Sequence, residues 1–436
     1  MSFFRSLFGK DETFHLPNLK FGRFTEHRLS VEKITKWDDA VAHFEKKDYT
    51  KSYISLLEYI ENEENTNLSF KEKLALRMSF ELKHGSKMIF GYSNQNGFFA
   101  TAKLVHVSTE DASLYKMLLE ENYALRYTRY AIDDEQNLVV MLHFDHSNAS
   151  PLNLFRALRE MAIICDTKDD IILADFPGTS PVNMEIQRSA SPQELKLKYN
   201  YFKDSLDSVI EWYESSEELV KKQPGLALFA FLGTLYKIDY LVKPEGKIQE
   251  KINDIHKYYH HRKLGVQVKT THIAELVRSL SEIEKTSFDQ EIYDTILTFG
   301  MLRDCNTEKA AELIAGELHY ASWYIQKNYL AEAGFIMDYI ASHLLFSHNL
   351  PKTFRQCLHL YLEVMETSFF EKIGYTYFSK RTGLPKKKAI VDAINVCLKN
   401  NNFSPDEFPL TDLNFSNKTL FAFSMLQCIS KTNFDD

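Results

Sequence analysis

The spacing of the apolar residues changes once along the chain, and this change constrains the fold more than any other feature. Between residues 74 and 145, apolar and polar residues alternate in short runs, which is typical of half-buried β-strands. After residue 192 the alternation ends, and apolar residues recur at the three- and four-residue spacing of helices that bury one face. The chain is therefore expected to be an α+β unit followed by a longer all-helical unit.

The first unit is predicted to be one antiparallel sheet with helices around it. Turn-forming residues such as Asn96 and Gly97 divide the alternating region into strands that tight hairpins can join. In order, we expect helices at 31–46 and 50–62, three strands within 74–107, a helix at 111–122, strands at 124–132 and 137–145, and a helix at 152–165. The prediction is a five-stranded antiparallel sheet with flanking helices.

Residues 177–192 form the clearest linker, because they hold three prolines, one glycine and four Ser or Thr residues. We therefore divide the chain into an N-terminal arm (1–30), an α+β domain (31–176), this linker and an all-helical domain (193–436). Helices are expected in the last part near 192–222, 226–242, 246–262, 270–285, 289–304, 307–327, 329–347, 351–371, 385–400 and 417–431. Such an array is typical of a bundle or an α-solenoid.

Charge and cysteine content limit the class of protein. The net charge is −8 and is shared by both parts of the chain, so nucleic-acid binding is not expected of the whole. Five cysteines without a CxxC pair indicate reduced thiols and a cytoplasmic protein. The longest apolar stretch, 225–236, is shorter than the roughly 20 residues that span a bilayer. Membrane contact by residues 1–8 is not expected either.

The α+β region has one family likeness. It is carried by the stretches 85–104, 114–145 and 150–170, and in particular by the passage LLEENYALRYTRYAIDDEQ. These stretches and their order resemble the type III secretion chaperone-like fold, including the YbjN-type proteins. The resemblance implies a non-enzymatic, cytosolic and often dimeric protein, with an apolar surface that holds another polypeptide. A homodimer through the α+β domain is one expectation from it.

Two groups of side chains are candidates for cation binding. His256 and His260 are four residues apart, so they share one helix face and could fill two positions of a zinc site. The alternative, a polar helix end, is favoured because no further ligands are evident. Asp166, Asp169 and Asp170 could hold a hard cation, but a solvated helix end is again the favoured interpretation.

Catalytic motifs are absent from the sequence. It contains no GxSxG, GxGxxG or GxxxxGK[ST] pattern, and its cysteines stand in apolar helical contexts that indicate core packing. No catalytic residue and no cofactor is therefore assigned.

Residues 376–400 resemble a helix-turn-helix segment: a short helix, a Thr-Gly turn and a second helix are predicted there. Basic side chains gather around the turn and could contact phosphates. They are Lys380, Arg381, Lys386, Lys387 and Lys388.

The leading hypothesis is a non-enzymatic protein-interaction or chaperone-like factor that binds a polypeptide partner. One alternative is a nucleic-acid-associated regulator that uses 376–400. Another is a helical-domain enzyme with its site between the two parts, for which His256 and His260 are the visible indication. A large exposed apolar patch on the sheet would favour the first hypothesis, and a deep cleft with convergent polar groups would favour an enzyme.

Overall fold

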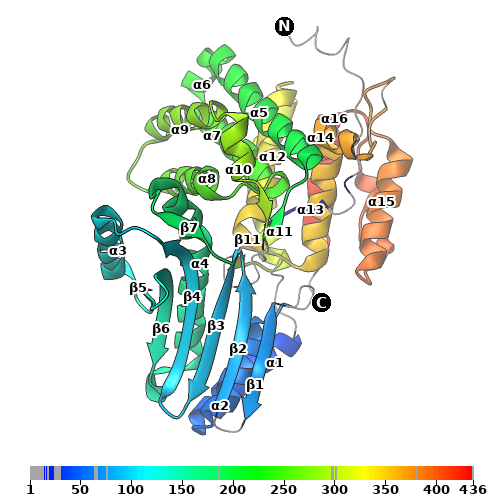
Figure 1. The fold of residues 1–436 in the computed structure, drawn as a ribbon. Coiled ribbons are helices and arrows are strands. Elements are labelled where there is room, and N and C mark those ends of the chain that lie inside the picture. The colour runs from blue at the N-terminus through cyan, green and yellow to red at the C-terminus, as the bar shows by residue number, and fades with distance from the viewer. Residues whose placement is uncertain are drawn as a thin grey trace.

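The computed structural model describes residues 14, 16, 19–23, 31–62, 67–74, 77–183, 187–295, 299, 302–379 and 381–434. An antiparallel sheet with helices forms the first part, and a mostly helical region forms the second (Figure 1). The predicted α+β class followed by a helical unit is therefore confirmed.

The sheet has seven strands, and the prediction of five is wrong. They are β1 (Leu68–Leu74), β2 (Arg77–His84), β3 (Lys87–Asn94), β4 (Gly97–Val107), β5 (Arg129–Ile132), β6 (Asn137–Phe144) and β7 (Thr179–Pro181). Six of them follow the order β1-β2-β3-β4-β6-β5, and β7 pairs with the end of β4. Two strands were not predicted: β1, which is rich in lysine, and β7, which lies within the expected linker.

Helices cover one face of this sheet. The helices of the first part are α1 (Val31–Glu45), α2 (Tyr49–Ile60), α3 (Ala112–Ala124) and α4 (Pro151–Asp175), with a 3₁₀ turn at His146–Asn148. Side chains such as Phe80 and Phe98 point to the covered face and share one core with α2 and α4. In Figure 1 the helices α1, α2 and α4 lie behind the sheet, so its other face is toward the reader.

The helical unit contains most of the predicted helices. They are α5 (Pro192–Ser215), α6 (Glu217–Lys222), α7 (Pro224–Leu241), α8 (Gly246–Tyr259), α9 (Val266–Ser281), α10 (Lys285–Gln290), α11 (Thr307–Gln326), α12 (Leu330–Ser347), α13 (Lys352–Met365), α14 (Thr367–Phe370), α15 (Lys387–Asn400) and α16 (Lys418–Lys431). Single 3₁₀ turns lie at Glu371–Ile373, Pro405–Glu407 and Leu410–Asp412. The helix predicted at 289–304 is wrong, because short strand pairings replace it: β9 (Tyr293–Asp294) pairs with β8 (Arg188–Ser189), and β10 (Arg303–Asp304) pairs with β11 (His348–Asn349).

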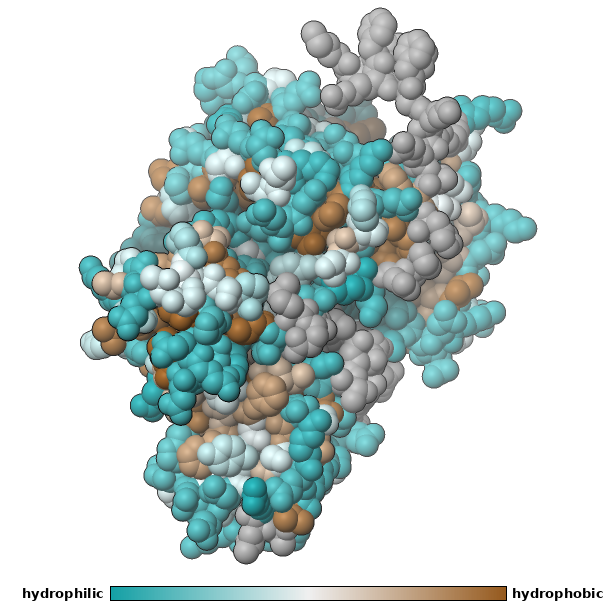
Figure 2. All heavy atoms as spheres, in the orientation of Figure 1, coloured by the Kyte–Doolittle hydropathy of each residue, from teal (hydrophilic) through white to brown (hydrophobic). Residues whose placement is uncertain are grey.

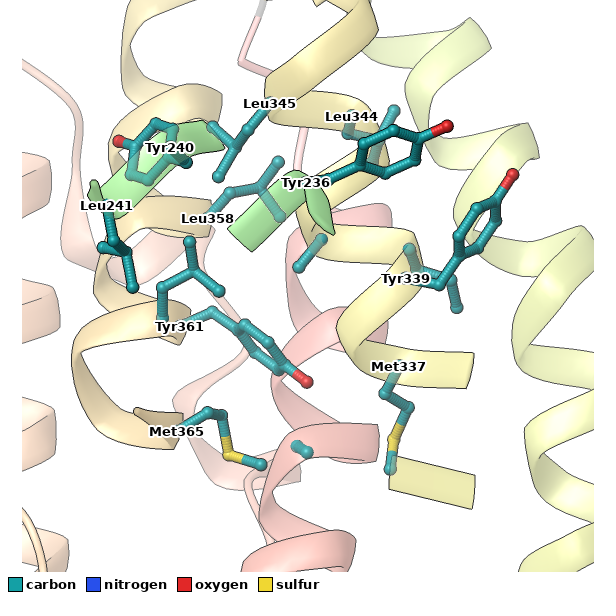
Figure 3. Packing of buried hydrophobic residues seen from close by; sticks show 14 of the residues in the cluster. Tyr236, Tyr240, Leu241, Met337, Tyr339, Leu344, Leu345, Leu358, Tyr361 and Met365 are labelled. Atoms are coloured by element: carbon teal, nitrogen blue, oxygen red, sulfur yellow. The ribbon is translucent and has the colours of Figure 1, made fainter. Parts of the chain in front are cut away.

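The apolar α7 is central to this second core. It packs against α12, α9 and α5 and is buried on nearly all sides, which explains its lack of a polar face. Figure 3 shows Tyr236 from α7 beside Tyr339 from α12, with Tyr361 of α13 below them. No helix among the described residues is both long and apolar enough to cross a membrane.

Candidate functional site

The uncovered face of the sheet carries a row of stacked rings. Tyr92 of β3 lies opposite Phe99 of β4 with ring centroids 4.8 Å apart, and Phe99 lies opposite His143 of β6 at 4.1 Å. Both pairs are nearly parallel, which is a favourable arrangement for ring contacts across a sheet. The stack therefore crosses three neighbouring strands on a surface over which the described part of the chain places no helix.

A second row continues the apolar surface beside the first. Phe90 lies opposite Thr101, and Thr101 lies opposite Met141. Phe90 is 40% exposed and Tyr92 is 47% exposed, so a large part of each side chain is open to solvent. We call the surface formed by Phe90, Tyr92, Phe99, Met141 and His143 the aromatic face.

The sequence of β3 explains how this face arises. In an ordinary half-buried strand one of the two alternating sets of side chains is polar. In β3, Ile89 points to the buried core, while Phe90 and Tyr92 point to the opposite face. This strand therefore places apolar side chains on both faces of the sheet.

Charged groups border the aromatic face. Lys103 of β4 lies 2.6 Å from Glu135 and 3.7 Å from Asp133 in the β5–β6 turn. Its hydrogen bond to Glu135 raises the pKa of Lys103. Figure 2 shows brown and pale atoms over the area of β2 to β4, among teal atoms of hydrophilic residues. An apolar centre with a charged border is the usual composition of a protein–protein interface.

The helix α3 offers a second apolar surface. A shallow hollow of about 730 Å³ lies along it and is lined by Ala112, Tyr115, Lys116, Leu119, Glu120 and Tyr123. Leu119 is 70% exposed and Tyr123 is 96% exposed. All six lining residues belong to one helix, so the hollow has only one wall.

The two predicted metal candidates lie in a cluster of histidines and tyrosines. The rings of His256 and His260 are 4.6 Å apart, as their spacing on one helix predicts. The structure adds two histidines that were not predicted, His343 of α12 and His348 of β11. The His343 ring stacks on Tyr339 at 5.1 Å and lies 5.5 Å from the His348 ring. In the sequence, the only indication that these two histidines are buried is the apolar run between residues 342 and 348.

The histidines of this cluster lie in apolar surroundings. Burial lowers the pKa of His343 to about 3 and the pKa of both His256 and His348 to about 4. Tyr236 and the Nδ1 atom of His256 are hydrogen-bonded at 2.7 Å. Among the described residues, no group of three or more His, Cys, Asp or Glu side chains has the geometry to hold a metal ion. Burial therefore disfavours the charged form of these imidazoles, His260 included.

The three aspartates of α4 are not at a solvated helix end, so that interpretation is wrong. The helix continues to Asp175, and Asp169 is fully buried against Lys87. Asp170 accepts a hydrogen bond of 2.5 Å from the Tyr293 hydroxyl, and its burial raises its pKa to about 7. Burial also raises the pKa of Asp166 well above its usual value. Asp170 thus connects α4 to the second part of the chain, whereas Asp169 pairs within the first part.

The predicted helix-turn-helix lacks its first helix. Phe378 and Pro385 form a β-bridge, and the backbone of Ser379 donates to Leu384, so this segment is a hairpin-like turn. The second helix exists as α15. Arg381, Lys386, Lys387 and Lys388 are exposed around its start, and Lys380 lies outside the described residues. Phosphate contact by these cations stays a prediction.

Comparisons with known proteins identify no relative. No family model matches the chain, and neither a curated protein nor a solved structure is significantly similar to it. The resemblance to the secretion chaperone-like fold stays a prediction.

Proposed function

We propose that the protein is a non-enzymatic interaction factor that holds a polypeptide partner on the aromatic face. The observation that carries this proposal is the solvent-exposed stack of Tyr92, Phe99 and His143 on the uncovered side of the sheet. Exposed rings of this kind contribute strongly to binding once a partner removes them from water. The partner segment should carry aromatic or aliphatic side chains, since the centre of the face offers few polar groups.

The proposal predicts that polar substitutions on the face abolish binding without unfolding the chain. The probe is a fluorescent peptide of about twelve residues in which Phe or Leu alternates with Ser or Lys, as a strand on this face would require. We expect saturable binding by anisotropy, and at least a tenfold weaker affinity for the double variant Phe90→Ser, Tyr92→Ser. Both side chains are half exposed, so the thermal melting curve should change little.

The matched control is Lys83→Ser, which changes an exposed residue on the same face of β2. This variant should bind the peptide as the parent chain does. A second measurement uses the B chain of reduced insulin, whose aggregation an equimolar amount of the protein should delay. If the double variant binds the peptide and delays aggregation as well as the parent chain, the aromatic face is not the binding surface.

We also propose that α3 binds a second copy of the chain. The apolar residues that line the hollow all belong to α3, so a second helix could pack against them. The sequence of α3 allows that second helix to be α3 of another copy, in antiparallel orientation. With a two-fold axis at Leu119, Tyr115 of each copy lies opposite Tyr123 of the other. Lys116 and Glu120 pair with each other within each helix at 3.8 Å, so they add no net charge beside that axis.

The substitution Leu119→Asp should therefore convert the dimer to a monomer. A carboxylate at the two-fold axis meets its own copy and must lose water, which opposes association. Two helices of this length bury less than a standard interface, so the dimer should dissociate at micromolar concentrations. Light scattering coupled to gel filtration measures the mass. The control Val396→Asp changes an equally helical, exposed apolar residue of α15 and should stay dimeric. A monomeric parent chain at high concentration would contradict the proposal.

A further inference from the structure

A short segment of the N-terminal arm lies in the helical unit as a bound peptide would. Arg23 is 4% exposed, and the residues that hold it come more than 200 positions later in the chain. We infer that the helical unit contains a peptide-binding socket for an aromatic–Gly–Arg segment, and that Phe21, Gly22 and Arg23 fill it in cis until a partner's segment replaces them.

The guanidinium group of Arg23 is surrounded by acceptors. Its Nε donates to Asp239 Oδ1 at 3.2 Å, and its Nη1 donates to Glu245 Oε1 at 2.7 Å. Its Nη2 donates to the carbonyl of Pro244 at 2.5 Å and to Gln249 Oε1 at 3.2 Å. Each of the three nitrogens thus has a partner, and two of the partners are charged, which is the arrangement that selects arginine over lysine.

The positive charge of Arg23 balances buried carboxyls of the socket. Burial raises the pKa of Asp239 and of Glu245, even though the charge of Arg23 beside them opposes the rise. Asp166 of α4 adds a third carboxyl to the field around the guanidinium. Without Arg23, the buried carboxyls of Asp239 and Glu245 would be left with the charge of Lys243, which also pairs with Asp294, so a second arginine should enter the socket readily.

The two preceding residues fit equally specific places. The Gly22 N–H donates to the carbonyl of Tyr240 at 2.8 Å, and the backbone of Gly22 is left-handed with φ of 73°. A Cβ atom at this position would lie 2.8 Å from the Tyr240 ring and 2.9 Å from Arg355, so a side chain does not fit. The socket therefore requires glycine before the arginine.

Phe21 occupies an aromatic pocket next to these groups. Its ring lies 5.1 Å from His359, 5.3 Å from Phe370 and 6.0 Å from Phe369. The hydrogen bonds and ring contacts described above for the three arm residues lie on the helical unit, from the end of α7 to α14. The residues that line the socket belong to the helical unit and not to the arm. A segment from another protein can therefore make the same contacts. This site is separate from the aromatic face and its test does not depend on that proposal.

The experiment uses the full chain with a protease site inserted between Glu26 and His27, and it is cut after folding. The probe is a fluorescent peptide with the sequence of residues 14–26. We expect the cut chain to exchange its arm for the probe with one-to-one stoichiometry. A probe with Arg23→Ala should bind at least tenfold more weakly, and so should one with Gly22→Ala. The matched control probe, Lys20→Ala, loses one charge at an exposed position and should bind normally.

A second variant covers the case in which the cut chain does not stay folded. In the uncut chain with Arg23→Ala, the wild-type probe should raise the melting temperature, whereas the uncut parent chain should show no shift. Absence of a shift in the variant would overturn the inference. A cut chain that stays folded without exchanging its arm over a day, or that binds the Arg23→Ala probe equally well, would overturn it too.

Discussion

The substitution Lys87→Met is expected to reduce the free energy of unfolding by about 3–5 kcal/mol. Lys87 and Asp169 form an ion pair of 2.9 Å in which both side chains are almost completely buried. Lys87 also donates to the carbonyl of Leu104 at 3.0 Å, and Ser86 donates to Asp169 at 2.7 Å. Removal of the ammonium leaves a carboxylate deep between β3 and α4 with only the Ser86 hydroxyl beside it. Urea unfolding followed by circular dichroism measures the loss.

The double variant Lys87→Met, Asp169→Leu separates charge from packing. It removes both buried charges, so it should recover much of the stability that the single variant loses. The surface control is Lys221→Met, because the Lys221–Glu217 pair is largely exposed and should contribute nothing measurable. A single variant that is as stable as the parent chain would show that Asp169 finds another cation or accepts a proton at little cost.

The second large effect concerns pH. His84 of β2 is 1% exposed, and its burial lowers its pKa to about 3 from the usual 6.5. The folded chain therefore keeps this imidazole neutral, whereas the unfolded chain binds a proton as the pH falls below 6.5. Its contribution to stability is complete above pH 6.5 and is lost on acidification, at about 1.4 kcal/mol per pH unit. We expect His84→Leu to flatten the stability curve between pH 6.5 and 4.5.

The control is a variant of a group whose pKa shift changes stability with pH in the opposite direction. The pKa of Asp170 is raised to about 7, so its burial costs stability as the pH rises from about 4 through 7. Asp170→Asn should remove that loss and make the chain more stable than the parent at pH 8. Chemical denaturation at several pH values measures both slopes. Equal slopes in the parent chain and in His84→Leu would show that the imidazole is protonated in the folded state.

The sequence indicated those elements whose signals are local. Turn residues such as Gly97 separate the hairpins of β2 to β4, and Ser150 before Pro151 accurately marks the start of α4. The strand β1 escaped notice because an edge strand tolerates lysines that obscure the alternation. The false helix at 289–304 has apolar residues at helical spacing, but tertiary pairing of β9 and β10 overrides that preference.

The candidate sites were harder to predict because they depend on contacts between distant residues. Phe90 and Tyr92 could have been found, since the alternating set of β3 that faces away from Ile89 contains Met88, Phe90 and Tyr92. Nothing local distinguishes Arg23 from other arginines, because its buried position depends on acceptors near residue 240. The same holds for Asp169, whose partner Lys87 lies on another element.

The long separation between Arg23 and its partners has a consequence for how the chain is made. Arg23 leaves the ribosome 216 residues before Asp239, a delay on the order of ten to forty seconds at ordinary translation rates. Lys87 and Asp169 are both synthesised well before Asp239, so the sheet and α4 can assemble before the arm has a place to bind. Docking of Arg23 on α7 and α8 is then among the later events of folding, because its acceptors are made after the sheet and α4.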